Sequence, residues 1–456
     1  MNFCTTRQFL AYAADNFGLQ LFETPHYRDH VEAALTQADK WHERECPLKA
    51  PLMMCFVFMS VLNRSESLAN LLKKLLEFYR FRNPGLQLDS VTPEAPIHSR
   101  YRLGPEPFRL FYEKQAAEVR PAPSFHGLRV WAVDGSAFNV PDTEKNDNFF
   151  GRPGCSRGST AFPQLHIVTL LDTTTRQTRG AVIQVCNGSD RDGLMTLLDG
   201  LEAGDLLLAD IGFAACWVFN KCQERDVKVL FRISDSWKPR VIERLGKGDS
   251  IVQVTGTVPR KYRGSPTATC RMRMIEYKIG ENERVRLLTD LLDPILYPAM
   301  ELAKLYHARW ECELSYDEKK NHLATVNTGT LKLCFRAKRP EGVLQEVYAL
   351  LGLYNMIRGM MAEAAELHEL DPLDISFVET VCIICNVTAR YQLASCEEER
   401  LQVYLQTLED IAGTLNGRPR RPRKCPRGVK VKMSKYPLKP GRGGEEPLDL
   451  TIELVA

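Results

Sequence analysis

The chain of 456 residues is long enough for two to four domains at the usual ~100–200 residues each. Apolar residues make up 44% and charged residues 26%, the balance of a globular protein with a sizeable core. The longest apolar run, Leu52 to Leu62, is much shorter than the ~20 residues of a membrane-spanning helix, and no secretory leader is visible. With 14 scattered cysteines that indicate reduced thiols, we expect a cytoplasmic protein without a membrane partner.

The net charge of +3 is unevenly placed along the chain. Residues 418–442 carry eleven Lys or Arg and no acid, so the rest of the chain carries −8. Such a basic segment is typical of a nucleic-acid-binding tail, although a merely solubilising tail has the same composition.

Residues 1–120 have helical patterns. A dense apolar run from Ala50 to Leu62 predicts a core helix, and helical spacing returns from Leu68 to Phe81 after the capping residues Ser65 and Ser67. Two helices joined by the turn at 83–85 could form a helix-turn-helix or belong to a plain bundle. We expect a helical DNA-binding domain over 1–120.

The hydrophobic period changes near Leu128 to that of strands. The pattern predicts strand, strand, strand, helix, strand, helix, strand, which is the order of a ribonuclease-H-like core with a partly parallel sheet. The predicted strands are 128–134, 164–172, 179–186, 205–210 and 227–233, and the predicted helices are 190–203 and 214–225. This first part of the core is expected to cover 121–236.

Short strands and turns without a long helix fill 237–292, which predicts a β insertion. Helical spacing returns over 297–323, inside a second core segment at 293–335, and continues at 340–366 and 375–411. The expected remainder is a helical region at 336–416 and an extended basic tail at 417–456. The fold class is therefore α/β, with a helical N-terminal domain and a helical, basic C-terminal part.

Two acids follow buried strands of this core. Asp134 is predicted to end its strand before Gly135, and Asp210 to end the strand 205–210. Chemistry gathers at the carboxyl ends of strands in an open α/β sheet. If the two strands are neighbours, the two carboxylates repel each other, and a hard divalent cation with oxygen ligands relieves that repulsion.

A third carboxylate lies on the helix predicted over 297–323. Tyr306, Arg309, Glu313 and Lys320 follow one another at spacings of three, four and seven residues, so they share one helical stripe. The stripe offers an acid for a metal ion and cations for phosphate. An ordinary amphipathic helix with ion pairs one turn apart gives the same pattern.

The combination of segments resembles the insertion-sequence-four family of DDE transposases. The string YHARWECELSYDEKK has the family's Y-x2-R-x3-E-x6-K pattern, and VDGSAFNVPDTEKNDNFFG and LLADIGF are similar to its two Asp segments. TPEAPIHSRYRLGPEPFRLFYEKQ resembles its N-terminal domain. The resemblance extends over about residues 50–440, and the four pieces stand in the family's order.

The resemblance implies a transposase that cuts DNA strands and joins them to target DNA. Asp134, Asp210 and Glu313 would hold two Mg²⁺ ions, with Mn²⁺ as a possible substitute. The partners would be double-stranded DNA, as inverted-repeat ends and target, and a second copy in a homodimer on paired ends. The family also forms a terminal hairpin with a flipped base. Where some relatives place a stacking Trp, this chain has Val285, and Trp237 and Trp310 are the nearest replacements.

Several polar and basic side chains are expected to contact DNA. Arg309 can bind a phosphate through two hydrogen bonds, whereas Lys320 acts as a point charge. The full expected set is Tyr306, Arg309, Trp310, Lys320, Asn139, Asn148, Arg284, Arg286, Arg418, Arg420, Arg421, Arg423 and Lys424.

Other readings compete with these assignments. The C-x-x-C pair of Cys382 and Cys385 has no second pair and fits two core cysteines better than a zinc site. His166 lies in an apolar strand, as a core or site-lining residue. At the level of function, the alternatives are a transposase-derived DNA-binding protein without catalysis and a nuclease of the same fold that cuts but does not join.

Overall fold

The computed structural model describes residues 25–41, 48–63, 66–73, 76, 94–155, 158–159, 162–262, 267–279, 283–323, 335–387, 396–415 and 452–455. No helix within these ranges is both long and apolar enough to cross a bilayer. The predicted turn at 83–85 and the basic cluster at 418–442 lie outside them.

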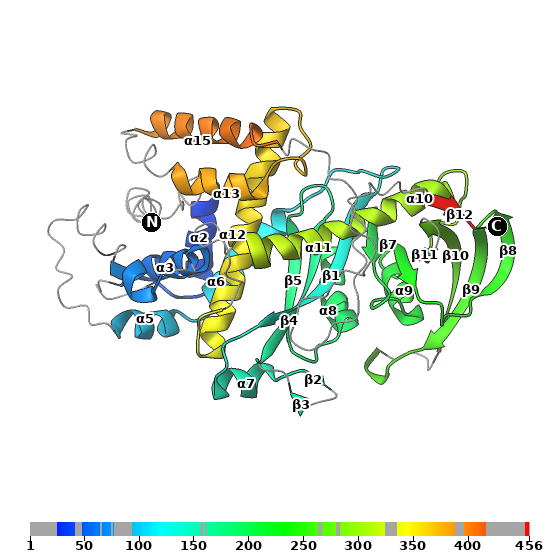
Figure 1. The fold of residues 1–456 in the computed structure, drawn as a ribbon, viewed down its shortest axis with the longest axis horizontal. Coiled ribbons are helices and arrows are strands. Elements are labelled where there is room, and N and C mark those ends of the chain that lie inside the picture. The colour runs from blue at the N-terminus through cyan, green and yellow to red at the C-terminus, as the bar shows by residue number, and fades with distance from the viewer. Residues whose placement is uncertain are drawn as a thin grey trace, which may run out of the picture.

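Helices from both ends of the chain form one body on one side of the sheet (Figure 1). Its centre is the 28-residue helix α12, which contacts α3, α6, α13 and α15. Every residue of α3 is buried, which confirms the core helix predicted from its apolar run. The bounds are α2 Pro25–Gln37, α3 Ala50–Leu62, α5 Ala95–Leu103, α6 Glu106–Glu118, α12 Pro340–Leu367, α13 Phe377–Asn386 and α15 Glu397–Ala412.

A mixed ten-stranded sheet is the centre of the second part of the molecule. Its strand order is β5-β4-β1-β6-β7-β11-β10-β9-β8, with β12 paired to β10. The strand β1 pairs parallel with β6, and β6 pairs parallel with β7, whereas β4 and β5 run antiparallel. These five strands have the ribonuclease-H-like order predicted from the sequence. Their bounds are β1 Arg129–Asn139, β4 Gln164–Asp172, β5 Thr178–Val185, β6 Asp205–Ala209 and β7 Lys228–Ile233.

The predicted β insertion continues the core sheet instead of forming a separate layer. Its last strand, β11, pairs with β7, and β10, β9 and β8 follow outward. The bounds are β8 Arg240–Gly246, β9 Asp249–Thr257, β10 Thr267–Ile279 and β11 Glu283–Thr289. Residues Ile452–Leu454 form β12 against β10, so the C-terminal end returns to the insertion (Figure 1).

Helices cover both faces of the sheet. Side chains alternate along β1, so its apolar residues pack against the helices on either face. Trp131 and Val133 face a cluster with α8 (Asp190–Leu197) and α9 (Cys216–Gln223). Val130 and Ala132 face the opposite cluster, with α10 (Ala299–Leu305) and α11 (Trp310–Asp317).

The helix predicted over 297–323 is not continuous. It consists of α10, a 3-10 turn at Tyr306–Arg309, α11, and a π-helical turn, η5, at Glu318–His322. The wide and narrow turns change the register of the predicted stripe, so its four residues do not project from one straight cylinder.

Candidate metal centre and DNA-cleavage site

Asp134 and Asp210 lie side by side on neighbouring parallel strands. The register pairs Ala132 with Leu208. Asp134 follows two residues later within β1, and Asp210 comes directly after the end of β6. The prediction that Asp134 ends its strand is wrong, because β1 continues to Asn139 through its ladder with β4. Asp134 instead stands where β1 passes the end of β6, so the two acids still share the carboxyl edge of the parallel pair.

Glu313 reaches this edge from α11, which Tyr316 fixes to the sheet. The buried Tyr316 hydroxyl lies 3.0 Å from the carbonyl oxygen of Asp134 and 2.9 Å from that of Ile167, and it accepts a hydrogen bond from the Thr169 hydroxyl. The helix that carries Glu313 is therefore anchored at the backbone of Asp134 itself. The sequence analysis missed Tyr316, whose spacing from Glu313 marks it only as a core-facing residue.

Arg309 lies between two of the three acids. Its Nη2 atom donates to Glu313 Oε1 at 2.8 Å, and its Nη1 atom lies 3.7 Å from Asp134 Oδ2. Tyr306 and Trp310 flank this guanidinium, with ring centres 6.0 and 5.9 Å away. Tyr306 is buried, whereas Trp310 is 52% exposed. The positive charge of Arg309 therefore partly balances the negative charges of Asp134 and Glu313.

The acids carry more negative charge than Arg309 can balance. Burial raises the pKa of Asp134 from 3.8 to about 6; Arg309 opposes this rise, and the charges of Asp210 and Glu313 add to it. A set of crowded carboxylate oxygens fits a hard divalent cation. Within the described residues, no three His, Cys, Asp or Glu side chains already stand close enough to hold one. Asp134, Asp210 and Glu313 offer the oxygen ligands that such an ion prefers, and their side chains would have to move closer together to hold it.

Lys320 reaches the strand just beyond Asp134. Its Nζ atom donates to the Ser136 hydroxyl and to the Ala137 carbonyl at 2.9 Å, and it lies 4.3 Å from the centre of the Phe138 ring. Burial lowers its pKa from 10.5 to about 8, and the charge of Asp134 opposes that fall. Lys320 therefore places a half-buried amino group beside the part of β1 that follows Asp134.

A buried network of ion pairs fixes the helical segment that carries Glu313 and Lys320 to the rest of the protein. Glu318 accepts hydrogen bonds from Arg176, Arg358 and the Tyr354 hydroxyl, and Arg176 also pairs with Glu311. Arg176 is fully buried, in the turn between β4 and β5, and has a left-handed backbone with φ 63°. The network joins that turn, α11 and α12, and sequence reasoning missed it because its members are far apart in the chain.

The other residues predicted to bind DNA lie farther from the acids. Asn139 ends β1, roughly 17 Å beyond Asp134 at ~3.4 Å per strand residue, and its side chain accepts from Gln164. Asn148 is exposed on α7 (Glu144–Phe150). Arg284 is exposed and pairs with Glu276.

Two neighbouring residues of β11 have structural roles: Arg286, predicted to contact DNA, and Val285, at the position of the stacking Trp. Arg286 donates to the carbonyls of Ser234 and Trp237, so its guanidinium holds the insertion loop. Val285 is only 1% exposed and packs in the core, where no base could stack on it. The tail residues Arg418, Arg420, Arg421, Arg423 and Lys424 lie outside the described residues. Cys382 and Cys385 are half-buried on α13.

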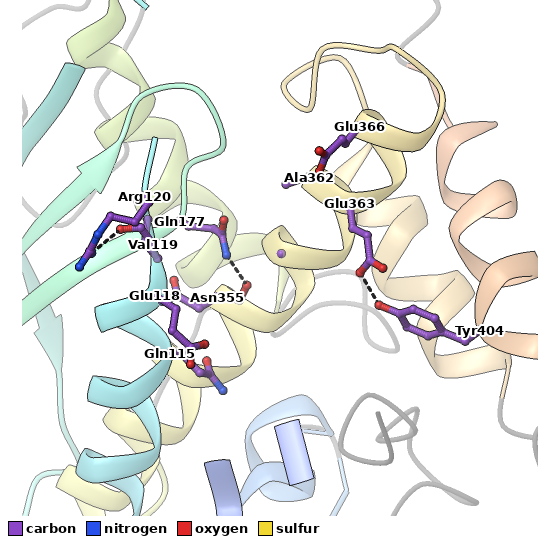
Figure 2. A pocket seen from close by; sticks show the side chains of 11 residues that line it. Gln115, Glu118, Val119, Arg120, Gln177, Asn355, Ala362, Glu363, Glu366 and Tyr404 are labelled. Carbon is purple, nitrogen blue, oxygen red and sulfur yellow. Dashed lines mark hydrogen bonds between the residues drawn. The ribbon is translucent and has the colours of Figure 1, made fainter. Parts of the chain in front are cut away.

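A large cavity lies away from the acids. It has a volume of about 680 Å³ and lies between α6, α12 and α15 (Figure 2). Glu118, Glu363 and Glu366 line it, and Tyr404 donates a hydrogen bond to Glu363. This acidic lining disfavours a phosphate backbone, so the cavity is poorly suited to binding DNA.

A second cavity, of about 490 Å³, is lined by Trp217, Trp237, Arg191 and Lys238. It also includes Ala214, four residues after Asp210. The loop that carries Asp210 therefore leads directly to an aromatic and basic hollow between the core and the insertion.

Comparisons with known proteins identify the family of the chain. Residues 125–356 match the family described as Transposase DDE domain, and residues 19–113 match the one described as Insertion element 4 transposase N-terminal. The chain is 28% identical over 410 residues to the transposase InsG for insertion sequence element IS4 of Escherichia coli (strain K12), covering 87% of this chain and 88% of that protein. A cryo-EM structure of the piggyBac transposase synaptic complex with hairpin DNA aligns with a TM-score of 0.43 and 11% identity, covering 88% of this chain and 86% of that one. The chain belongs to the DDE transposases of the insertion-sequence-four family, enzymes that use divalent metal ions to cleave and transfer DNA strands.

Proposed function

We propose that Asp134, Asp210 and Glu313 are the metal ligands of this transposase. The observation that carries the proposal is the register of β1 and β6, which places two acids side by side beneath the helix of the third. Two Mg²⁺ ions held there would activate the attacking water or 3′-hydroxyl and stabilise the leaving oxygen. Because only the nucleophile differs, one site serves both cleavage and joining.

Arg309 is proposed to change partners when DNA binds. Its guanidinium pairs with Glu313 at 2.8 Å, and the residue is 8% exposed. Once the acids hold cations, they no longer need its charge, and the planar guanidinium is free to bind a phosphate through two hydrogen bonds. Tyr306, buried beneath it, limits how far the guanidinium can move.

The flipped base of a terminal hairpin is proposed to meet aromatic side chains other than residue 285. Trp310 is exposed beside Arg309, where a base leaving the helix could stack on it. The cavity beyond Asp210 offers Trp237 as a second stacking surface, with Lys238 nearby for phosphate. Trp310 and Trp237 would thus take the place of the stacking Trp that some relatives have at the position of Val285.

Binding of the element ends is assigned to regions outside the metal centre. The N-terminal helices over 1–120 and the basic residues 418–442 are proposed to bind the two DNA ends, with the partner copy in a homodimer. Because eleven cations would release counterions from DNA, the affinity should fall steeply with salt.

Incubation of the full chain with DNA carrying the element's ends and Mg²⁺ tests the proposal. Wild type should cut the ends and join them to target DNA. Asp134→Asn, Asp210→Asn and Glu313→Gln should each abolish cleavage but keep end binding, measured by gel shift in EDTA. Absence of cleavage by wild type would favour a DNA-binding protein without catalysis, and cleavage without joined product would favour a nuclease. Retained cleavage in one variant would remove that residue from the metal centre.

A further inference from the structure

A fourth carboxylate, that of Asp190, lies at the same edge of the sheet. A methyl group built at Gly212 would lie 3.1 Å from Asp210 Oδ1 and 3.6 Å from Asp190 Oδ2. These two oxygens are therefore no farther apart than the sum of those distances. A methyl group at Gly135 would lie 2.1 Å from Asp190 Oδ1, so the carboxylate occupies the space that any side chain after Asp134 would fill.

His166 holds Asp190 in this position. The His166 Nε2 atom lies 2.6 Å from Asp190 Oδ1. His166 belongs to β4, opposite Ala137 of β1, and lies on the face of the sheet that α8 covers. Within the described part of the chain, Asp190 Oδ2 has no hydrogen-bond partner, and this is the oxygen that faces Gly212 and Asp210.

The first turn of α8 is fixed on three further sides. Arg191 donates to the Ala214 carbonyl at 3.0 Å, beyond Asp210. Asp192 accepts a hydrogen bond from the Tyr262 hydroxyl at 2.7 Å and pairs with Lys261, both near the insertion. Gly193 lies so close to Val168 of β4 that a methyl group there would be 2.6 Å from its side chain. These contacts fix the backbone of the turn that carries Asp190, and the contact with His166 orients its side chain.

We propose that Asp190, oriented by His166, is a positioning residue of the metal centre that accepts a hydrogen bond from a water molecule on the ion beside Asp210. This inference rests on the proposed function of Asp134, Asp210 and Glu313. A small hard cation keeps several of its waters when one or two carboxylates bind it, and those waters are hydrogen-bond donors. A carboxylate held near Asp210 with one free oxygen strengthens ion binding without replacing a ligand.

Titration of Mn²⁺ into the full-length protein by calorimetry, without DNA, tests the inference. Asp190→Asn should raise the Mn²⁺ dissociation constant about tenfold, the usual effect of losing an outer partner of a metal ligand. His166→Gln should raise it less, because Asp190 keeps its charge and loses only its orientation. Asp192→Asn is the matched control: it removes an acid two residues away that faces Tyr262 and Lys261, and it should leave the dissociation constant unchanged.

The same titration separates failure of this inference from failure of the proposed function. If Asp210→Asn loses Mn²⁺ binding and Asp190→Asn binds like wild type, Asp190 has no such role. Equal losses in Asp190→Asn and Asp192→Asn would also overturn it, because they would reflect only the overall charge. If Asp210→Asn binds Mn²⁺ like wild type, the proposed metal centre itself is wrong. In DNA cleavage, raising the Mn²⁺ concentration should rescue Asp190→Asn but not Asp210→Asn.

Discussion

Replacing Asp134 with asparagine should stabilise the metal-free protein at neutral pH although it removes a metal ligand. The folded protein raises the pKa of Asp134 from 3.8 to about 6, mainly by burial and against the charge of Arg309. A folded-state pKa above the unfolded value means that the folded protein binds more protons between these two pH values. Stability therefore falls as pH rises through that window, and the whole cost is present above about pH 6.

The magnitude follows from the pKa. A difference of about two pH units corresponds to about 3 kcal/mol at neutral pH. Asparagine has nearly the same shape and no charge, so the advantage of Asp134→Asn should grow by about 2 kcal/mol from about pH 4.5 to about pH 8.

Thermal unfolding in EDTA across this pH range measures the effect, at roughly 2–4 °C per kcal/mol for a unit of this size. Asp142→Asn, which removes a carboxylate from an exposed surface ion pair with Arg152, is the control for loss of an aspartate away from the acids. Excess Mg²⁺ should reverse the order, because only the wild type gains stability from the ion. A melting temperature of Asp134→Asn that stays at or below that of wild type at pH 8 in EDTA would refute the reasoning.

Three further variants test other parts of the account. Glu318→Gln leaves Arg358 buried without its carboxylate and Arg176 with Glu311 alone, and it should cost about 3–5 kcal/mol in the free energy of unfolding by denaturant. A cost below about 1 kcal/mol would contradict the network. Lys319→Met should stabilise the protein by about 1–4 kcal/mol near pH 7, because burial lowers the Lys319 pKa from 10.5 to about 7. This gain in stability should shrink as the pH rises toward 10.5, and a gain that grows with pH would be inconsistent with this reasoning. Trp310→Ala should leave the melting temperature unchanged, because the ring is half exposed, yet reduce hairpin ends on denaturing gels; an unchanged hairpin fraction would exclude Trp310 from the base-flipping step.

The sequence was informative where chemistry and local pattern coincide. Asp134 and Asp210 could be singled out because each stands at the end of an apolar β run. That their strands are neighbours was only a condition of the sequence argument, and the pairing of β1 with β6 meets it. The extent of β1 could not be predicted, since it depends on pairing with β4 over residues more than twenty positions away. For the same reason the insertion gave no sign that it extends the core sheet through β7 and β11.

The supporting residues around the acids were hidden for a different reason. Tyr316 and Glu318 have the spacing of an ordinary helix, and only the packed structure reveals which backbone atoms and charges they meet. Asp190 has the sequence signature of any acid in the first turn of a helix, which is favourable there on local grounds alone. Its position beside Asp210 depends on Gly135 and Gly212, because a side chain at either glycine would occupy the space of the Asp190 carboxylate or lie against it. These two glycines are the sequence feature that reflects this position.

Direct coordination by the acids is tested best by a change of metal preference. Asp210→Cys replaces a hard carboxylate with a softer thiolate, which binds Mg²⁺ poorly and tolerates Mn²⁺ better. The account predicts that Asp210→Cys does not cleave end DNA in Mg²⁺ and regains cleavage in Mn²⁺, whereas Asp210→Ala stays inactive in both. Full cleavage by Asp210→Cys in Mg²⁺, or equal rescue of Asp210→Ala by Mn²⁺, would contradict a metal centre built on Asp210.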